Sequence, residues 1–337
     1  MSYYVPLIRA DVIAPALRWM VNHGRDVDAA LRAVDLGWYP WDDPHATMPV
    51  KNGAHFFFNL GRSEGPDIAF RVIAETGVRD IGLLGNAIAR CSTPRSALTL
   101  AAEMMPYQCT HELLVVSSGG DTCTVTDNWA FLFKDQETRH MVQQYVLALI
   151  DMICRATGQQ PPRLETVRMV PHPEHGLAHM HPWLGCAMEA DANAPLSTDI
   201  AAAVADHAFL EEFREAGLEI PIPTLLPLRG DGSMAGCIAL LVRGMMRDGA
   251  PDLGKMAALA GVSRRTLQRR LASEGVTFSD VVEMVRRDLA SKALSDPRIR
   301  LQELSESLGY SHQSTLTRAV RRWTGQAPTL VRDNRTC

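Results

Sequence analysis

Polar side chains that can form paired hydrogen bonds recur at helical spacing in two stretches near the C-terminus. The first stretch carries Arg264, Arg265, Gln268 and Arg269. The second carries His312, Gln313, Thr315 and Arg318, followed by Arg321 and Arg322. A guanidinium group can bond to guanine O6 and N7 together, and a primary amide can do the same with adenine. The last two arginines suit phosphate contacts, which fix position without reading sequence. The chemistry indicated is recognition of double-stranded DNA.

Each stretch follows the pattern of a helix-turn-helix unit. A small residue stands four positions before a glycine, as Ala257 does before Gly261 and Ser305 before Gly309. The small side chain lets two helices cross closely, and the glycine supplies the left-handed turn between them. One such match arises easily by chance, whereas two matches, each followed by an arginine-bearing helix, are specific.

The second helix of each unit should turn its polar residues outward. Ser263 and Ser311 are the predicted N-caps of these two helices. In the first unit Leu267 and Leu271 stand four residues apart and should face the core, which leaves the arginines and the glutamine on the opposite side.

A long helix is predicted between the two units. Residues 278–294 place Val281, Val285 and Leu289 on one stripe, and this stripe is interpreted as core packing. A helix of about 17 residues spans roughly 25 Å. That length could set two recognition helices about one DNA turn apart, near 34 Å, on one face of the duplex. A further helix over 235–246 should lead into the first unit.

The distribution of charge separates the chain into two parts. The net charge is −4, which by itself argues against binding to nucleic acid. Residues 1–239 carry 17 Lys and Arg against 28 Asp and Glu, a balance of −11, and residues 240–337 carry 17 against 10, a balance of +7. A cationic module suited to a polyanion therefore adjoins an acidic module.

Three regions are expected along the chain. Residues 219–234 hold several prolines and glycines and are the predicted linker, which separates residues 1–218 from a DNA-binding domain over 235–337. Helices are predicted over 12–22, 27–36, 66–76, 93–105, 136–156 and 198–216, and strands over 112–117, 121–125, 129–133 and 163–170. Helices around a modest antiparallel sheet make the first region an α+β domain, while the C-terminal domain is all-α.

The C-terminal region resembles the DNA-binding domain of AraC/XylS-type bacterial transcription regulators. The resemblance covers about 238–332 and rests on four motifs: residues 263–271, Arg287 to Ala290, Leu308 to Ser311, and Arg318 to Pro328. It implies that Arg265, Gln268 and Arg269 read bases in the first unit, and that Gln313, Ser314 and Arg318 do so in the second. Leu316 and Val320 depart from the family, which usually has phenylalanine there, so looser packing of the second unit is expected.

The N-terminal region resembles the effector-binding domain of the subgroup related to ornithine-utilisation regulators. The order of segments 27–36, 43–49, 82–87 and 93–98 carries this looser resemblance. It implies a domain that binds a small-molecule effector and often mediates dimerisation, with no ligand residues carried over.

A metal-binding, cupin-like enzyme with an appended DNA-binding module is the alternative. His172, His175, His179 and His181 fall within ten residues and could bind a transition metal. Three prolines in 171–182 disfavour the helix that would place His175 and His179 on one face, and the next carboxylate, Glu189, lies far along the chain for a cupin motif. The preferred interpretation is a loop beside a strand, with no metal and no cofactor.

The expected function is therefore transcription regulation. The chain should bind promoter DNA, respond to an effector and act as an activator, with RNA polymerase and a second copy of the chain as candidate partners. Seven cysteines without a Cys-x-x-Cys pair indicate reduced thiols. No apolar run long enough to span a membrane and no secretory signal is found, so a cytoplasmic location is expected. None of the cysteines stands in a nucleophile motif, and catalysis is not expected.

Overall fold

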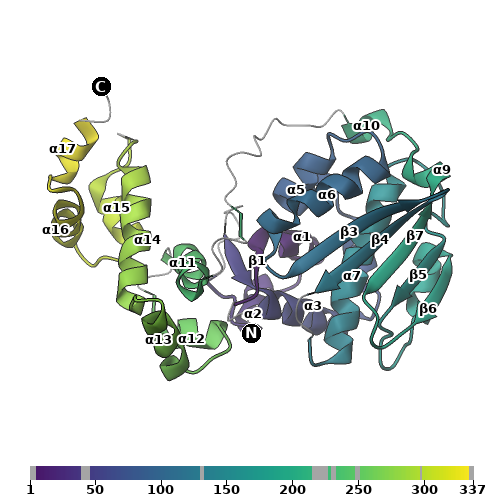
Figure 1. The fold of residues 1–337 in the computed structure, drawn as a ribbon, viewed down its shortest axis with the longest axis horizontal. Coiled ribbons are helices and arrows are strands. Elements are labelled where there is room, and N and C mark those ends of the chain that lie inside the picture. The colour runs from purple at the N-terminus through teal and green to yellow at the C-terminus, as the bar shows by residue number, and fades with distance from the viewer. Residues whose placement is uncertain are drawn as a thin grey trace.

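The chain folds into an α+β part followed by an elongated helical part. The computed structural model describes residues 5–38, 46–129, 133–214, 227–228, 233–246, 251–296 and 298–333. Figure 1 shows the helical part, α11 to α17, reaching away from the larger part that holds the sheet. Both expected fold classes are confirmed. Most of the predicted linker, 219–234, lies outside the described residues.

The larger part alternates short strands with helices. Its elements in chain order are β1 (Leu7–Arg9), η1 (Ala10–Ile13), α1 (Ala14–Asn22), α2 (Val27–Ala33), β2 (Thr47–Pro49), α3 (Val50–Glu64), α4 (Ile68–Ala74), η2 (Val78–Ile81), α5 (Gly82–Ile88), α6 (Pro94–Gln108), β3 (Glu112–Gly119), β4 (Thr122–Trp129), α7 (Gln136–Arg155), β5 (Thr166–Met169), η3 (Ala178–Met180), α8 (His181–Leu184), β6 (Ala187–Ala190), β7 (Leu196–Ala201), α9 (Ala202–Ala205) and α10 (Glu211–Arg214).

The main sheet has five strands in the order β3-β4-β7-β5-β6, and a separate two-stranded sheet joins β1 to β2. The predicted hairpin between β3 and β4 is confirmed, with Gly120 at a φ of +60° in its turn. β5 and β6 pair in parallel, so the expectation of a purely antiparallel sheet is wrong. The segment between these two strands includes η3 and α8, and this crossover brings the chain back in the same direction.

The helix predicted over 198–216 is wrong, because its first residues form the strand β7. Leu196, Thr198 and Ile200 are buried and alternate with half-exposed residues, which is the period of two of a strand with one covered face. β7 lies between β4 and β5, and only the short helices α9 and α10 follow it. The strand predicted over 129–133 is not a separate element at its start, since Trp129 ends β4, and residues 130–132 lie outside the described part of the chain.

Helices cover one face of the sheet. Cys123 and Val125 on β4 are buried toward the helices, whereas Thr124 and Thr126 on the other face are partly exposed. The long helix α7 packs against α3, α4 and α6 and is buried along most of its length (Figure 1). α3, which the sequence pattern did not predict, approaches α7 closely because Gly61 leaves room for Met141; a Cβ atom there would lie 2.8 Å from the Met141 methyl carbon.

The smaller part consists of two helical units on a common helix. Its elements are α11 (Met234–Met245), α12 (Leu253–Leu259), α13 (Arg264–Ser273), α14 (Phe278–Ala293), α15 (Leu301–Ser307), α16 (Gln313–Thr324) and α17 (Pro328–Asp333). The helices predicted over 235–246 and 278–294 are thus confirmed as α11 and α14. Thr277 caps α14, accepting a hydrogen bond from the Asp280 backbone N–H at 3.2 Å.

The two units belong to different hydrophobic cores. α11, α12, α13 and the first half of α14 share one continuous core with the α+β part. The second unit has a small core of its own, made of the buried residues Ala290, Leu294, Leu304, Leu308, Leu316 and Val320. The second unit is therefore joined to the rest of the described chain chiefly through α14.

Candidate functional site

The first helix-turn-helix unit has the turn that its sequence predicts. Gly261 adopts a φ of +67°, and its N–H and that of Val262 donate to the carbonyls of Ala258 and Ala257, which closes the end of α12. Ala257 is buried at the crossing of the two helices. α13 then begins at Arg264, and the Ser263 hydroxyl accepts the Thr266 N–H at 3.1 Å, so this predicted cap is confirmed.

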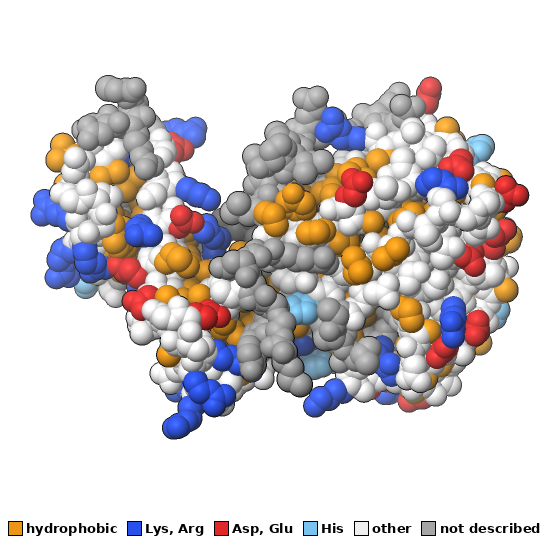
Figure 2. Space-filling view, in the orientation of Figure 1, with side chains coloured by type: hydrophobic (Ala, Val, Ile, Leu, Met, Phe, Trp, Pro, Cys, Tyr) orange, Lys and Arg blue, Asp and Glu red, His pale blue; other side chains and the backbone are white. Residues whose placement is uncertain are grey.

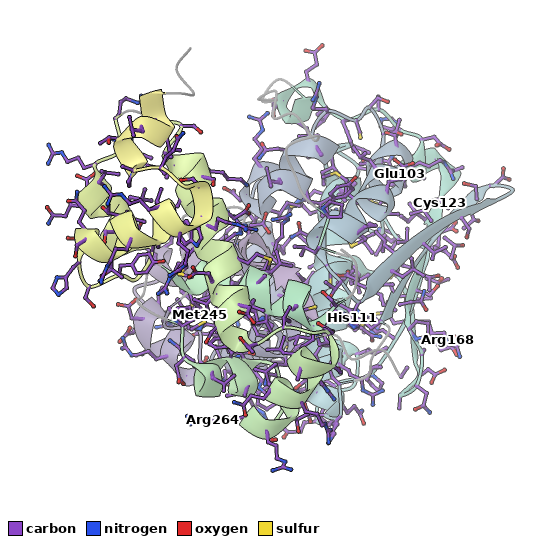
Figure 3. All side chains as sticks on the ribbon, turned by 60° about the vertical axis from the view of Figure 1, so that its left-hand side comes forward. Glu103, His111, Cys123, Arg168, Met245 and Arg264 are labelled. Carbon is purple, nitrogen blue, oxygen red and sulfur yellow. The ribbon has the colours of Figure 1, made fainter. Side chains whose placement is uncertain are left out.

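The outward face of α13 carries the predicted polar residues. Leu267 and Leu271 are fully buried. The exposed set comprises Arg264, Arg265, Gln268 and Arg269. Arg264 differs from the others because its guanidinium group lies back against α12, 3.9 Å from Asp252 and close to Gly254. Figure 3 shows Arg264 on the helical part, far from Arg168 on the sheet.

The second unit repeats this geometry with one difference. Gly309 has a φ of +67° and Ser305 is buried, as the pattern predicts. The predicted cap at Ser311 is wrong: α16 begins one residue later than expected, His312 occupies the N-cap position, and no side chain caps the helix.

The predicted contact residues of the second unit also lie on its outer side. His312, Gln313, Ser314, Arg318, Arg321 and Arg322 are exposed and Thr315 is half-buried. Leu316 and Val320, which replace the phenylalanines usual in the family, are fully buried. The looser packing expected for the second unit therefore does not expose these two side chains to solvent.

α14 holds the second unit through charged side chains. Arg322 pairs with Glu283 of α14, and the Trp323 indole N–H donates to the same carboxylate at 2.7 Å. Arg286 of α14 donates to the carbonyls of Leu308 at 3.0 Å and Gly309 at 3.3 Å, and its guanidinium group lies 4.3 Å from the centre of the Tyr310 ring. Arg286 and Arg322 are therefore engaged in positioning the unit.

Positive charge gathers where these helices face solvent. Figure 2 shows Lys and Arg side chains along the outer edge of the helical part and at the tip formed by α12 and α13. Acidic side chains are frequent on the α+β part in the same view. This division agrees with the charge balance read from the sequence.

The α+β part encloses a cavity of about 120 Å³. It lies among η1, β2, α3, α5, α6, β3 and α7, and its walls are formed mainly by Val, Ile, Leu, Met and Phe side chains. Sequence patterns did not indicate it, because its walls come from segments far apart in the chain and each of their residues looks like ordinary core.

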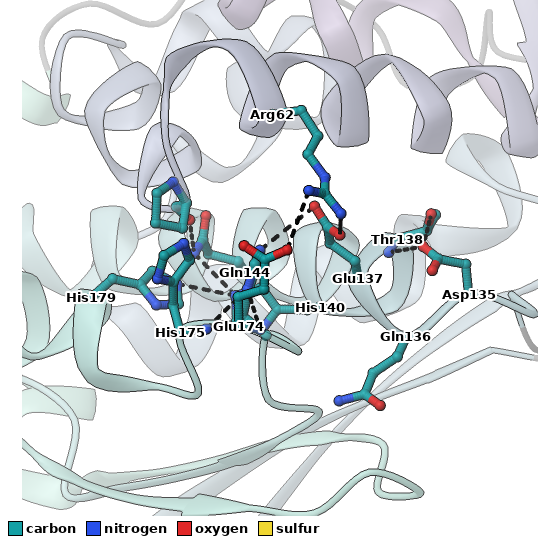
Figure 4. Close-up of polar contacts among 12 residues, drawn as sticks. Arg62, Asp135, Gln136, Glu137, Thr138, His140, Gln144, Glu174, His175 and His179 are labelled. Carbon is teal, nitrogen blue, oxygen red and sulfur yellow. Dashed lines mark hydrogen bonds and ion pairs between the residues drawn. The ribbon is translucent and has the colours of Figure 1, made fainter.

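The histidines that suggested a metal site form a cluster with a partner that the sequence did not indicate. His140 of α7 lies beside His175 and His179 (Figure 4), and His172 completes the cluster. His181 begins the helix α8. His140 Nε2 lies 3.1 Å from His179 Nε2, and its Nδ1 lies 2.8 Å from the Val170 carbonyl oxygen, so Nδ1 carries the proton.

Burial keeps His140 and His179 neutral. It lowers the pKa of His140 to about 3 and that of His179 to about 4. Beside them, Arg62 bridges Glu137 at 2.5 Å and Glu174 at 3.4 Å (Figure 4). Among the described residues, no group of three or more His, Cys, Asp or Glu side chains is arranged to hold a metal ion. Residues 172–176 form a turn after β5, as expected for a loop beside a strand, whereas the residues from Ala178 to Leu184 are helical in η3 and α8.

Two family models match the chain. Residues 24–202 match the arabinose-binding domain of AraC transcription regulator, N-terminal, and residues 256–334 match a helix-turn-helix domain. No helix among the described residues is long and apolar enough to cross a membrane.

Curated relatives match the C-terminal region. The transcriptional regulator VirS of Mycobacterium tuberculosis is 36% identical over 105 residues, which is 31% of each chain. VqsM of Pseudomonas aeruginosa is 37% identical over 87 residues (26% of this chain, 27% of that one), and the ornithine utilization regulator of the same species is 37% identical over 83 residues (25% and 24%). The chain thus spans less than a third of the length of these relatives, all of which are named as regulators. Because the N-terminal model alone covers more than half of the sequence, the chain belongs to the family of AraC transcription regulators.

Proposed function

We propose that this protein binds promoter DNA through both helix-turn-helix units and activates transcription under the control of a small-molecule effector held by its N-terminal domain. The observation that carries the proposal is the matched presentation of polar residues: α13 and α16 each bury their apolar residues and expose most of the side chains predicted to contact DNA. The proposed domains are 1–218 for the effector and dimerisation and 235–337 for DNA, with 219–234 as linker.

The exposed residues fall into two proposed roles. Base reading is assigned to Arg265, Gln268, Arg269, Gln313, Ser314 and Arg318. Arg321 is assigned to phosphate, and His312 and Thr315 stand at the start of α16, where a helix enters the major groove. Arg264 and Arg322 are engaged with their own units, so their proposed contribution is to hold the recognition helices and to add positive charge.

α14 sets the spacing between the two recognition helices. Its 16 residues span about 24 Å. Successive major grooves on one face of B-DNA are about 34 Å apart. Arg286, Arg322 and Trp323 hold the second unit against α14. We therefore expect α13 and α16 to enter adjacent major grooves in a fixed relative orientation.

The proposal includes the partners that a promoter activator needs. RNA polymerase is the proposed target of activation, a second copy of the chain is the proposed dimer partner, and the place of action is the cytoplasm, where bacterial promoters lie. The proposed role is regulatory and not enzymatic.

Replacing one base-reading arginine tests the proposal. The full-length protein would first be used to select its binding sites from genomic DNA fragments, and affinity would then be measured by fluorescence anisotropy on a selected site and on unrelated DNA. Arg269→Ala should weaken binding to the selected site by about 1–3 kcal/mol and change binding to unrelated DNA much less.

Arg168→Ala, which removes an exposed arginine from the outer face of the sheet, is the matched control and should leave both affinities unchanged. Equal losses on both DNAs for Arg269→Ala would assign this residue to phosphate. Failure to select any site would contradict the proposed function.

A further inference from the structure

The polar groups at the wall of the cavity are used by the protein itself. Gln108 donates to Asp11 at 2.8 Å and the Tyr145 hydroxyl donates to the Val12 carbonyl at 2.7 Å. The Trp129 indole N–H donates to a carboxylate of β4 at 2.9 Å. Glu112, the acidic residue of the wall, shares a side-chain hydrogen bond with Asp127 of β4, and the remaining wall is almost entirely aliphatic or aromatic. A molecule bound here meets apolar surface and few hydrogen-bonding groups that are not already engaged.

This chemistry selects an apolar ligand over a sugar. Each hydroxyl of a sugar buried in such a cavity would lose its hydrogen bonds to water, at a cost of about 1–3 kcal/mol per group. An apolar molecule has no such cost and gains from leaving water. The size is also limiting, because a protein cavity of about 150 Å³ lined by Leu, Ile and Phe holds benzene, and the cavity here measures about 120 Å³.

One wall of the cavity is also the surface on which the first helix-turn-helix unit rests. Met48, Val50 and Ala54 line the cavity from β2 and the first turns of α3. Thr47, the neighbour of Met48 in β2, points to the other side, and its carbonyl oxygen lies close to Gly244 of α11. A single short segment therefore contacts both the cavity, through the side chains of Met48, Val50 and Ala54, and the DNA-binding domain, through the backbone of Thr47.

Lys51 carries this contact to the turn of the first unit. Its ammonium group donates to the carbonyl of Ala258 at 2.7 Å, in the last turn of α12, at the negative end of the helix dipole. The same Nζ atom lies 3.7 Å from where a Cβ atom of Gly261 would stand. Partial burial lowers the pKa of Lys51. Val50, its neighbour, lines the cavity, so a shift of this wall moves the group that holds the turn before α13.

We propose that this cavity is the effector site, that it takes a small uncharged apolar molecule such as an aromatic ring compound, and that occupancy is transmitted to DNA binding through residues 47–54. The part of this proposal that concerns DNA binding rests on the proposed function. The part that concerns ligand binding stands independently, because binding can be measured without DNA.

Ligand binding is tested with benzene, indole and L-arabinose as probes. Isothermal titration and thermal unfolding of the full-length protein should show saturable binding of indole or benzene and none of arabinose. Ala101→Leu on α6 extends a side chain into the cavity and should weaken indole binding at least 10-fold. Ala102→Leu, on the same helix but not in the cavity wall, should bind indole as the unaltered protein does.

A second cavity-filling variant shows whether a loss of indole binding comes from the filled cavity or from misfolding. Ala54→Leu fills the cavity from α3 and should give the same loss as Ala101→Leu, with far-ultraviolet circular dichroism showing that each variant is folded. Indole binding that survives both cavity-filling variants, or saturable binding of arabinose without binding of indole or benzene, would overturn the proposal.

The path to DNA is tested with Lys51→Ala, and with Lys134→Ala as the matched control at an exposed position. Saturating indole should change the affinity of the unaltered protein for its selected site at least five-fold. In Lys51→Ala the ratio of the DNA affinities with and without indole should fall toward one although indole still binds. In Lys134→Ala that ratio should stay as in the unaltered protein. An unchanged ratio in Lys51→Ala would overturn the path. Absence of DNA binding in every sample would instead refute the proposed function and leave the ligand result standing.

Discussion

Because the second helix-turn-helix unit has a hydrophobic core of its own, a mutation in that core should destabilise this unit and not the rest of the protein. Leu316 is fully buried in that core, and Leu316→Ala removes three carbon atoms from it. At about 0.8 kcal/mol for each buried carbon, the transfer loss is roughly 2.4 kcal/mol, and the remaining cavity brings the total to about 3 kcal/mol. Because this core contains few residues and joins the rest through α14, the loss should fall on the opening of the second unit alone.

Amide hydrogen exchange measures that opening residue by residue. In Leu316→Ala the amides of α15 and α16 should exchange about 150-fold faster, since 1.4 kcal/mol corresponds to a factor of ten. The amides of α7 should keep their protection, because α7 belongs to the other core. Leu330→Ala, an exposed leucine of α17, is the matched control and should change little. An equal loss of protection in α7 would show one cooperative unit and refute the division into two cores.

Three further outcomes follow from the same contacts. Stability should decline as pH falls below about 6.5, because burial holds the pKa of His140 near 3 and that of His179 near 4, so the unfolded chain binds more protons; His140 alone should cost about 2 kcal/mol at pH 5. Urea unfolding at pH 7.5 and pH 5 measures this loss, and a His140→Asn variant with the same pH dependence would contradict the assignment. Ser263→Ala should destabilise the first unit by about 1 kcal/mol and Ser311→Ala by little, because only Ser263 caps a helix; equal losses in thermal unfolding would reverse that distinction. Affinity for DNA should fall steeply with salt, as contacts from the +7 region to phosphates require; an affinity independent of salt would exclude those contacts.

The DNA-binding half could be predicted in detail because its determinants are local. Gly261 and Gly309 need their left-handed backbone within a few residues of the small side chains that they serve, and helical periodicity alone separates Leu267 and Leu271 from the arginines. The predicted cap at Ser311 was wrong because α16 begins one residue later than expected. A shift of one position is enough to replace the N-cap residue.

The N-terminal half was harder because its elements depend on neighbours distant in sequence. Residues 198–201 were predicted as the start of a helix, yet they form a strand because β4 pairs with all four of them and β5 pairs with Thr198 and Asp199 on the other side. α3 was missed because Gly53 and Gly61 disfavour a helix locally, although Gly61 is needed for close packing on α7 and Gly53 for close packing on Met48 of β2. His140 has no sequence link to the other three histidines and reaches them only because α7 passes beside the turn after β5.

The sequence by itself determined the family, the polar outer faces of α13 and α16 and the positive charge of the C-terminal region, because each depends on residue types along the chain. Only the tertiary structure decided that the N-terminal domain holds an apolar cavity and that one segment beside it contacts the DNA-binding domain. The cavity exists because helices from across the N-terminal domain leave space between their apolar faces, and the contact of Lys51 with Ala258 joins residues more than two hundred positions apart. Such contacts arise from packing in three dimensions, and no periodicity along the chain encodes them.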